Sequence, residues 1–232
     1  MARYDAAEWT CARFAESVEG TLESEFGSAR RAETLGRSGI LSIRAVQDGE
    51  GLAIEGWYDS LAVVRAGPEG ASTPDAAGIL GGRYRGWLTP DGEYESNVVP
   101  FVPALLREVF EFSNLLAQFF PRLSPTPLQP GADWTDGEGF TIWRLADSTT
   151  AAGPVSRFRW LRQTSWNEGI GSGDSTVVVR RTEREDGTLR WRVGTGPLGW
   201  TRRIVARLEL TEGDGRSELT QDIRVRRLPT CP

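Results

Sequence analysis

Apolar and polar side chains alternate along most of the chain, and a period of two residues is typical of half-buried β-strands. Two such runs flank a turn at residues 48–51, and residues 83–88 lead into a second tight turn at residues 89–92. Glycine-containing turns are also predicted at residues 185–187 and 213–215. Further strands are predicted at residues 61–66, 140–146, 158–165, 176–181, 188–193, 200–210 and 218–228. Short turns between neighbouring strands favour an antiparallel sheet.

Two segments have apolar residues at helical spacing instead. In residues 5–26 the apolar side chains from Trp9 to Leu22 recur at intervals of four or five, which predicts an N-terminal amphipathic helix. Residues 104–119 lie between two prolines and are apolar on most sides, which predicts a long, covered helix. The sequence therefore predicts a mainly β protein of the α+β kind. Its antiparallel strands form a sandwich or a half-barrel, with the long apolar helix packed on the sheet.

The length of 232 residues suits a single domain, 1–232, with one substantial core. The proline-rich residues 121–130 form a connector between two possible halves, 1–120 and 131–232. No apolar run approaches the roughly 18 to 20 residues of a membrane-spanning helix, so the chain is not expected to span a membrane. The first ten residues are polar and do not match a signal peptide.

Composition limits the chemistry that the chain can perform, because all 27 basic residues are arginines and there is neither lysine nor histidine. Ser/His/Asp and Cys/His nucleophile systems need a histidine base, and a phosphate loop or a pyridoxal imine needs a lysine. We therefore expect no catalytic residues, no cofactor and no metal site, and a protein that is not an enzyme. The net charge of −5 argues against nucleic acid as the main partner.

Two motifs match chemical patterns only in part. Residues 194–199 fit the glycine pattern of dinucleotide-binding loops, but a strand-like run follows them and Pro197 removes an amide. A strand-to-strand turn is the better interpretation. Asp133, Asp136 and Glu138 suggest a calcium loop or a pair of catalytic carboxylates. The spacing of these residues does not match the calcium-binding loop of an EF-hand. A pair of catalytic carboxylates, as in a glycosidase, would have to face each other across a cleft.

Cys11 and Cys231 are the only cysteines and lie near opposite ends of the chain. Because domain termini often lie close together, we predict a disulfide between them, with two separate thiols as the alternative. Disulfides are typical of oxidising compartments, which predicts the periplasm or the cell surface, with the cytoplasm as the alternative.

Tryptophan and arginine are abundant, with nine tryptophans in the chain. Both residue types are enriched at the centres of protein interfaces, although core packing accounts for most tryptophans. The candidate interface around residues 194–199 comprises Trp191, Arg192, Trp200, Arg202 and Arg203. Near the C-terminus, Arg224 and Arg226 fall on one face of a predicted strand. They indicate either a solvated edge strand or a surface for an anionic partner.

Residues 119–125 read Phe-Phe-Pro-Arg-Leu-Ser-Pro, and residues 128–134 read Leu-Gln-Pro-Gly-Ala-Asp-Trp. Together with the turn at residues 88–92, these stretches resemble a family of uncharacterised, β-rich bacterial envelope proteins and lipoproteins. Ser124 stands where that family usually has proline, and Ala132 is inserted before the aspartate. The resemblance implies an exported protein of unknown activity and supplies no catalytic residues. No apolar run precedes Cys11, so the lipid-attachment motif of the lipoproteins is not matched.

Three functional hypotheses follow. The leading one is a non-catalytic binding or scaffold protein of the bacterial cell envelope, such as an accessory subunit that binds a protein partner on the soluble face of a membrane complex. The alternative is a carrier of an apolar ligand or lipid in a groove between sheet and helix. The third is an enzyme that uses only carboxylates, such as a glycosidase.

Overall fold

The computed structural model describes residues 2–107, 109–170, 177–211 and 213–229. Twelve strands in this part of the chain belong to one antiparallel sheet. The strands are β1 (Ala12–Phe26), β2 (Ala29–Asp48), β3 (Gly51–Gly67), β4 (Gly70–Ser72), β5 (Tyr84–Leu88), β6 (Tyr94–Val98), β7 (Asp133–Thr135), β8 (Phe140–Thr150), β9 (Gly153–Ile170), β10 (Val177–Arg192), β11 (Gly196–Leu210) and β12 (Gly215–Arg227). The helices are η1 (Ala6–Glu8), η2 (Ala77–Ile79), α1 (Ala104–Arg107) and η3 (Leu116–Phe119).

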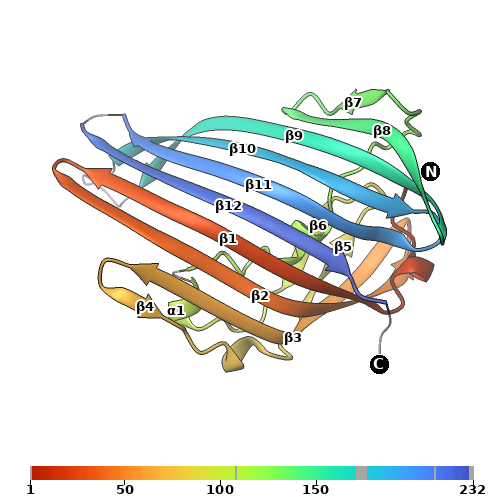
Figure 1. Ribbon diagram of the computed structural model, residues 1–232, viewed down its shortest axis with the longest axis horizontal. Helices are drawn as coiled ribbons and strands as arrows, with labels where there is room; N and C mark the ends of the chain where they lie inside the picture. Colours follow the sequence, from red (N-terminus) through yellow and green to blue (C-terminus); the bar gives the residue numbers. More distant parts are fainter. Residues whose placement is uncertain (1, 108, 171–176, 212, 230–232) are drawn as a thin grey trace.

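The sheet is curved and open (Figure 1). Its strand order is β6-β5-β3-β2-β1-β12-β11-β10-β9-β8-β7, with β4 paired to β3. The first and last long strands are neighbours, because β1 pairs with β12 from Phe14↔Arg227 to Phe26↔Gly215. The predicted mainly β, antiparallel fold is confirmed. The single unclosed sheet corresponds to the half-barrel alternative, since the described residues form no second sheet that would make a sandwich.

Three predicted hairpins are confirmed: β2 and β3 join at residues 48–51, β5 and β6 at residues 89–92, and β11 and β12 at residues 213–215. Residues 194–199 follow the end of β10 at Arg192 and include the start of β11 at Gly196, so they belong to the expected strand-to-strand turn.

The turn predicted at residues 185–187 is wrong, because β10 continues through these residues. Gly187 lies inside the strand, where a Cβ atom would collide with the Trp160 indole on the neighbouring strand. This glycine therefore permits close packing between strands, although its sequence context resembles a turn.

The predicted N-terminal helix is also wrong. Most of residues 5–26 form β1, and only the three residues of η1 are helical. Ala12, Phe14 and Val18 are buried on one face of β1. A spacing of four residues places side chains on one face of a strand as well as near one face of a helix, so the apolar pattern fitted both structures.

The long helix predicted at residues 104–119 is wrong too, because only α1 and η3 are helical there. Leu106, Phe112, Leu115 and Phe119 are nevertheless almost fully buried. A regular helix directs its side chains around the whole axis, whereas this irregular path turns most of its apolar side chains toward the sheet. The apolar pattern correctly indicated burial but not helical structure.

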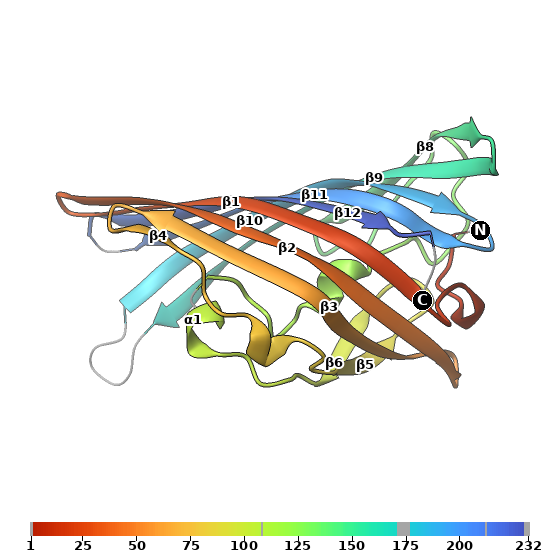
Figure 2. The same cartoon turned by 60° about the horizontal axis from the view of Figure 1, so that its bottom comes forward.

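Residues 99–107 and 109–123 form what we call the covering segment, which lies on the concave side of the sheet (Figure 2). The core lies between this segment and the sheet. There the Trp200 ring on β11 lies 5.4 Å from Phe14 on β1 and 5.8 Å from Phe119 of the covering segment, centroid to centroid. Aromatic packing therefore holds the covering segment against the sheet.

Burial raises the pKa of all four tyrosines, well above the usual value for Tyr4 and Tyr58, upward for Tyr84, and to about 12 for Tyr94. An unfolded chain releases these protons at about pH 10. Above that pH the folded state therefore binds more protons than the unfolded state does. Their contribution to stability is complete below about pH 10 and is lost as the pH rises toward the folded values. In an alkaline titration, tyrosinate absorbance should therefore appear together with the loss of the circular dichroism signal. Ionisation near pH 10 in a chain that is still folded would contradict this.

Candidate ligand-binding groove

A groove of about 740 Å³ lies between the concave face of the sheet and the covering segment. Strands β9 to β12 form its floor, and residues 107–122 form much of its opposite wall. Alternation along each strand sends every second side chain into this space. The groove therefore combines side chains that are far apart in the sequence.

One part of the lining is apolar. The floor contributes the side chains Trp160, Trp200, Ile204, Ala206 and Leu219, and the covering segment contributes Val109, Phe110, Ala117 and Phe120. Ala206 on β11 pairs directly with Leu219 on β12, and Ile204 lies on the same face of β11 as Ala206. Arg202 lies between Ile204 and Trp200 on that face, so we use the name apolar stripe for Ile204, Ala206 and Leu219 with the apolar side chains of the covering segment. An apolar chain can lie along this stripe.

Charged side chains flank the apolar stripe on β9, β10 and β11. The Arg202 guanidinium lies 2.7 Å from the Glu185 carboxylate, and the Trp160 indole donates to the same carboxylate at 3.0 Å. Arg181 lies 3.6 Å from Glu183. Arg162 is exposed at the groove, and its side chain makes no ion pair or hydrogen bond with the residues that the structure describes. The polar part of the groove therefore has an arginine that is available to an anion.

The inner end of the groove holds a buried polar network. Arg37 lies 2.5 Å from Glu16, and Tyr58 donates to the other oxygen of Glu16 at 2.7 Å. Arg37 also donates to Gln118 of the covering segment at 3.1 Å. Burial is the largest single influence on the pKa of Arg37 and acts to lower it, but Glu16, Tyr58 and Tyr84 together raise it, and the net shift is upward. The charged pair therefore persists in the core and joins the sheet to the covering segment.

Sequence reasoning missed this network, because its members come from three strands and share no local motif. The one available signal was Glu16, a charged residue in the otherwise apolar series of Ala12, Phe14 and Val18.

The lining of the groove also includes an ion-paired arginine. Arg122 lies 2.5 Å from Glu93 and 2.7 Å from Asp136. Six lining residues carry a buried donor atom with no hydrogen-bond partner among the described residues: Arg37 Nε, Tyr94 Oη, Arg122 Nε, Arg181 Nε, Trp200 Nε1 and Arg202 Nε. Unpaired buried donors are costly, so this lining favours a ligand that supplies acceptor oxygens.

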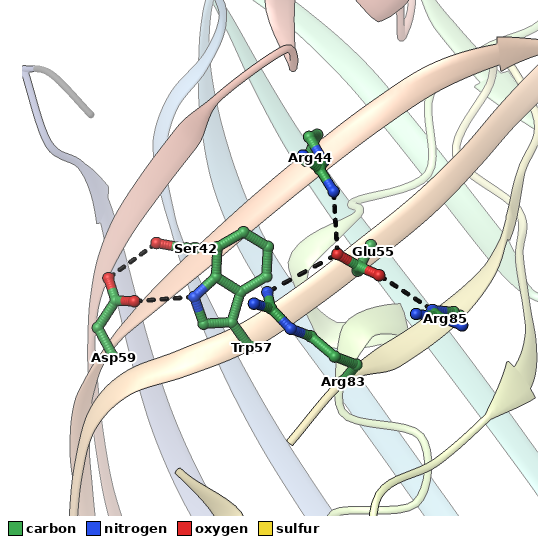
Figure 3. A network of polar contacts seen from close by, with 7 residues as sticks. All are labelled: Ser42, Arg44, Glu55, Trp57, Asp59, Arg83 and Arg85. Carbon is green, nitrogen blue, oxygen red and sulfur yellow. Dashed lines mark hydrogen bonds and ion pairs between the residues drawn. The ribbon is translucent and has the colours of Figure 1, made fainter. Parts of the chain in front are cut away.

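A second polar network lies on the outer face of β2, β3 and β5. Figure 3 shows three arginines around Glu55, where Arg85 donates at 2.9 Å, and Arg44 and Arg83 lie 3.3 and 3.7 Å away. The Arg83 guanidinium also lies 3.7 Å from the centre of the Trp57 ring. Three cations around one carboxylate leave a surplus of positive charge on this part of the outer face.

The structure places the candidate interface residues in different environments. Trp191 and Trp200 belong to the core, with 1% and 3% of their surfaces exposed. Arg202 points into the groove, whereas Arg203 lies on the outer face and pairs with Asp222 at 3.8 Å. Arg192 donates to Thr150 at 3.0 Å. The expected joint patch is not formed, because neighbouring strand residues point to opposite faces of the sheet.

The acidic cluster is likewise divided. Asp133 and Glu138 are exposed, whereas Asp136 accepts from the backbone N–H groups of Glu138 and Phe140 and pairs with Arg122. Among the described residues, no group of three or more His, Cys, Asp or Glu side chains is arranged to hold a metal ion. Asp136 therefore shapes the β7–β8 turn and also lines the groove.

The turn at residues 194–199 is anchored by the N-terminal region. The Gly194 N–H donates to the Glu8 carboxylate at 2.8 Å, and Arg227 donates to the backbone oxygens of Glu8 and Thr195. Cys231 lies outside the described residues, so the disulfide with Cys11 stays a prediction.

The fold and the groove define an open antiparallel sheet with a covered, partly apolar concave face. No helix in the part of the chain that the structure describes is long and apolar enough to cross a membrane. No protein-family model matches the chain, and no curated protein matches it.

Two solved structures are weakly similar to this chain. A DUF1329 family protein from Desulfovibrio piger has a TM-score of 0.24 and 11% identity, over 94% of this chain and 87% of that one. A structure described as a "putative outer membrane lipoprotein-sorting protein domain" from Vibrio parahaemolyticus has a TM-score of 0.20 and 9% identity, over the same shares of the two chains. Similarities of this size carry no functional argument, so function is derived from the geometry of this chain.

Proposed function

We propose that the protein binds an amphipathic ligand in the groove and acts as its carrier, without chemical conversion. The ligand combines an apolar chain with an anionic or oxygen-rich head. The observation that supports this most directly is the composition of the groove, where an apolar stripe adjoins arginines and buried donors without partners. This deepens the carrier hypothesis by adding a polar head to the apolar ligand.

The dimensions support the same proposal. A volume of about 740 Å³ lies within the range of roughly 300 to 1,000 Å³ that is usual for small-molecule pockets. The apolar chain would lie over Ile204, Ala206 and Leu219, and the head would accept from Arg162 and from the unpaired donors. We propose the periplasmic or cell-surface side of the envelope as the location, where the predicted terminal disulfide would be stable.

The proposal is tested by filling the groove. Ala206 points into it, whereas the adjacent Val205 points to the outer face of the same strand. Ala206→Trp should weaken the binding of cis-parinaric acid, a fluorescent long-chain carboxylate, by at least about tenfold, or about 1.4 kcal/mol. Val205→Trp is the matched control and should bind normally. Fluorescence titration measures both affinities.

Equal affinity in the two variants would contradict a ligand site in the groove. The role of the head is tested with the methyl ester of the same probe, which should bind the wild-type protein more weakly. Tighter or equal binding of the ester would contradict the anionic head and leave only an apolar ligand.

Docking of a protein partner is the second candidate function. Four large apolar residues near the end of β6 and in the covering segment are exposed: Val98, Val99, Phe101 and Leu105. Large exposed apolar side chains within one short stretch of sequence favour an interaction surface. They would serve the scaffold or accessory-subunit role in place of the buried Trp191 and Trp200.

A further inference from the structure

Five exposed arginines gather on the outer face of the sheet, near the start of β1 and the end of β12. They are Arg157, Arg159, Arg190, Arg224 and Arg226, and we call them the convex arginine patch. The strand register places them in two adjacent rows. Arg157 pairs with Arg190 on β10, and Gly199 on β11 separates Arg190 from Arg226 on β12. In the second row, Thr188 and Thr201 separate Arg159 from Arg224.

The position of β12 changes the interpretation of Arg224 and Arg226. The sequence indicated either a solvated edge strand or an anionic partner, but β12 is paired on both sides, with β1 and with β11. The edge interpretation is therefore wrong. Protection of a sheet edge cannot explain these two cations.

The arrangement is electrostatically unfavourable in the isolated chain. Arg157 and Arg190 are directly opposite each other, and like charges in that position destabilise a sheet. Among the residues that the structure describes, none of the five arginines forms an ion pair or a side-chain hydrogen bond. Many other arginines of the chain do, as the pair of Arg207 with Glu218 at 2.5 Å illustrates.

Carboxylates mark the limit of the patch. In the next row along the sheet, Asp186 and Asp222 flank Arg203, and Asp222 pairs with it at 3.8 Å. On the other side of β1, the outer-face network around Glu55 again has surplus arginines (Figure 3). Positive charge is therefore concentrated at one end of this face, although the whole chain carries a net charge of −5.

We propose that the convex arginine patch docks the protein on a bilayer surface that contains anionic phospholipids. The patch spans four adjacent strands, or roughly 15 to 20 Å at about 4.8 Å per strand, which suits several lipid headgroups. Guanidinium groups bind phosphate oxygens in a bidentate manner. Val193, which is 68% exposed at the β10–β11 turn, adds an apolar contact beside the patch. Docking does not depend on what occupies the groove.

Sedimentation with lipid vesicles tests this proposal. The wild-type protein should sediment with vesicles of phosphatidylcholine and phosphatidylglycerol at low ionic strength, and not with phosphatidylcholine alone. Binding should be lost at about 0.5 M salt, where surface charges are screened. Arg157→Gln/Arg190→Gln should bind the anionic vesicles about 30-fold more weakly, or about fivefold for each arginine removed.

Arg180→Gln/Arg184→Gln is the matched control, because it removes two exposed arginines from the outer face of β10, away from the patch. It should bind the anionic vesicles like the wild-type protein. Equal losses in the two double variants, or equal binding to both kinds of vesicle, would overturn the proposal. Tighter binding to a short DNA duplex than to vesicles, abolished by the same patch variant, would replace the membrane with a nucleic acid partner. Circular dichroism of each variant establishes that it is folded.

Discussion

Replacing Arg37 with leucine is expected to lower the free energy of unfolding by about 3 to 5 kcal/mol, because it leaves the Glu16 carboxylate buried without its cation. The side chains of Arg37 and Glu16 are only 2% and 0% exposed, so the carboxylate left behind would be poorly solvated. Since small domains are stable by roughly 5 to 15 kcal/mol, this single change removes a large share of the total. Urea denaturation of the wild-type and variant proteins measures the difference.

Removing the whole network is expected to cost less stability than removing its cation alone. The triple variant Glu16→Leu/Arg37→Leu/Tyr58→Phe removes both charges and the hydroxyl that donates to Glu16, so it should be much less destabilised than Arg37→Leu alone. Arg207→Leu is the exposed control. Its partner is Glu218, the two side chains are 57% and 43% exposed, and its loss should cost less than about 1 kcal/mol. If Arg37→Leu and Arg207→Leu had similar costs, the network would not be buried as described.

Replacing Phe112 with alanine is expected to cost about 3 to 5 kcal/mol, because its ring is completely buried and alanine would leave a cavity. The ring lies in the covering segment, 5.5 Å from the Arg37 guanidinium and 6.5 Å from the Phe110 ring. The same denaturation experiment measures this loss. It tests whether the covering segment is part of the folded core.

Leu105 offers a control within the same segment, since 64% of its surface is exposed. Leu105→Ala should change stability by less than about 0.5 kcal/mol. A loss below about 1 kcal/mol for Phe112→Ala would show that the covering segment detaches from the sheet at little cost. In that case Phe112 would instead face a ligand or a partner.

The alternation of side chains was sufficient to predict most strands and three of their hairpins. A period of two is a local property, and turns such as residues 48–51 and 213–215 contain glycines that favour a change of direction. The buried character of residues 104–119 was also predictable, because an apolar surface on all sides must be covered wherever it lies. The backbone conformation of these residues was not predictable, because their irregular path depends on the sheet that curves around them.

By itself the sequence determined that this is a mainly β protein with no lysine or histidine for catalysis, since composition and the two-residue period need no knowledge of the fold. Only the tertiary structure decided which strands are neighbours and in what register. That register joins Glu16, Arg37 and Tyr58 into one buried network and sets Arg157 opposite Arg190. It also places Trp200 in the core and Arg203 on the outer face. Pairing between distant strands depends on the packing of the whole sheet, and a local pattern cannot encode it. A register shift of one residue would move every side chain of a strand to the opposite face of the sheet.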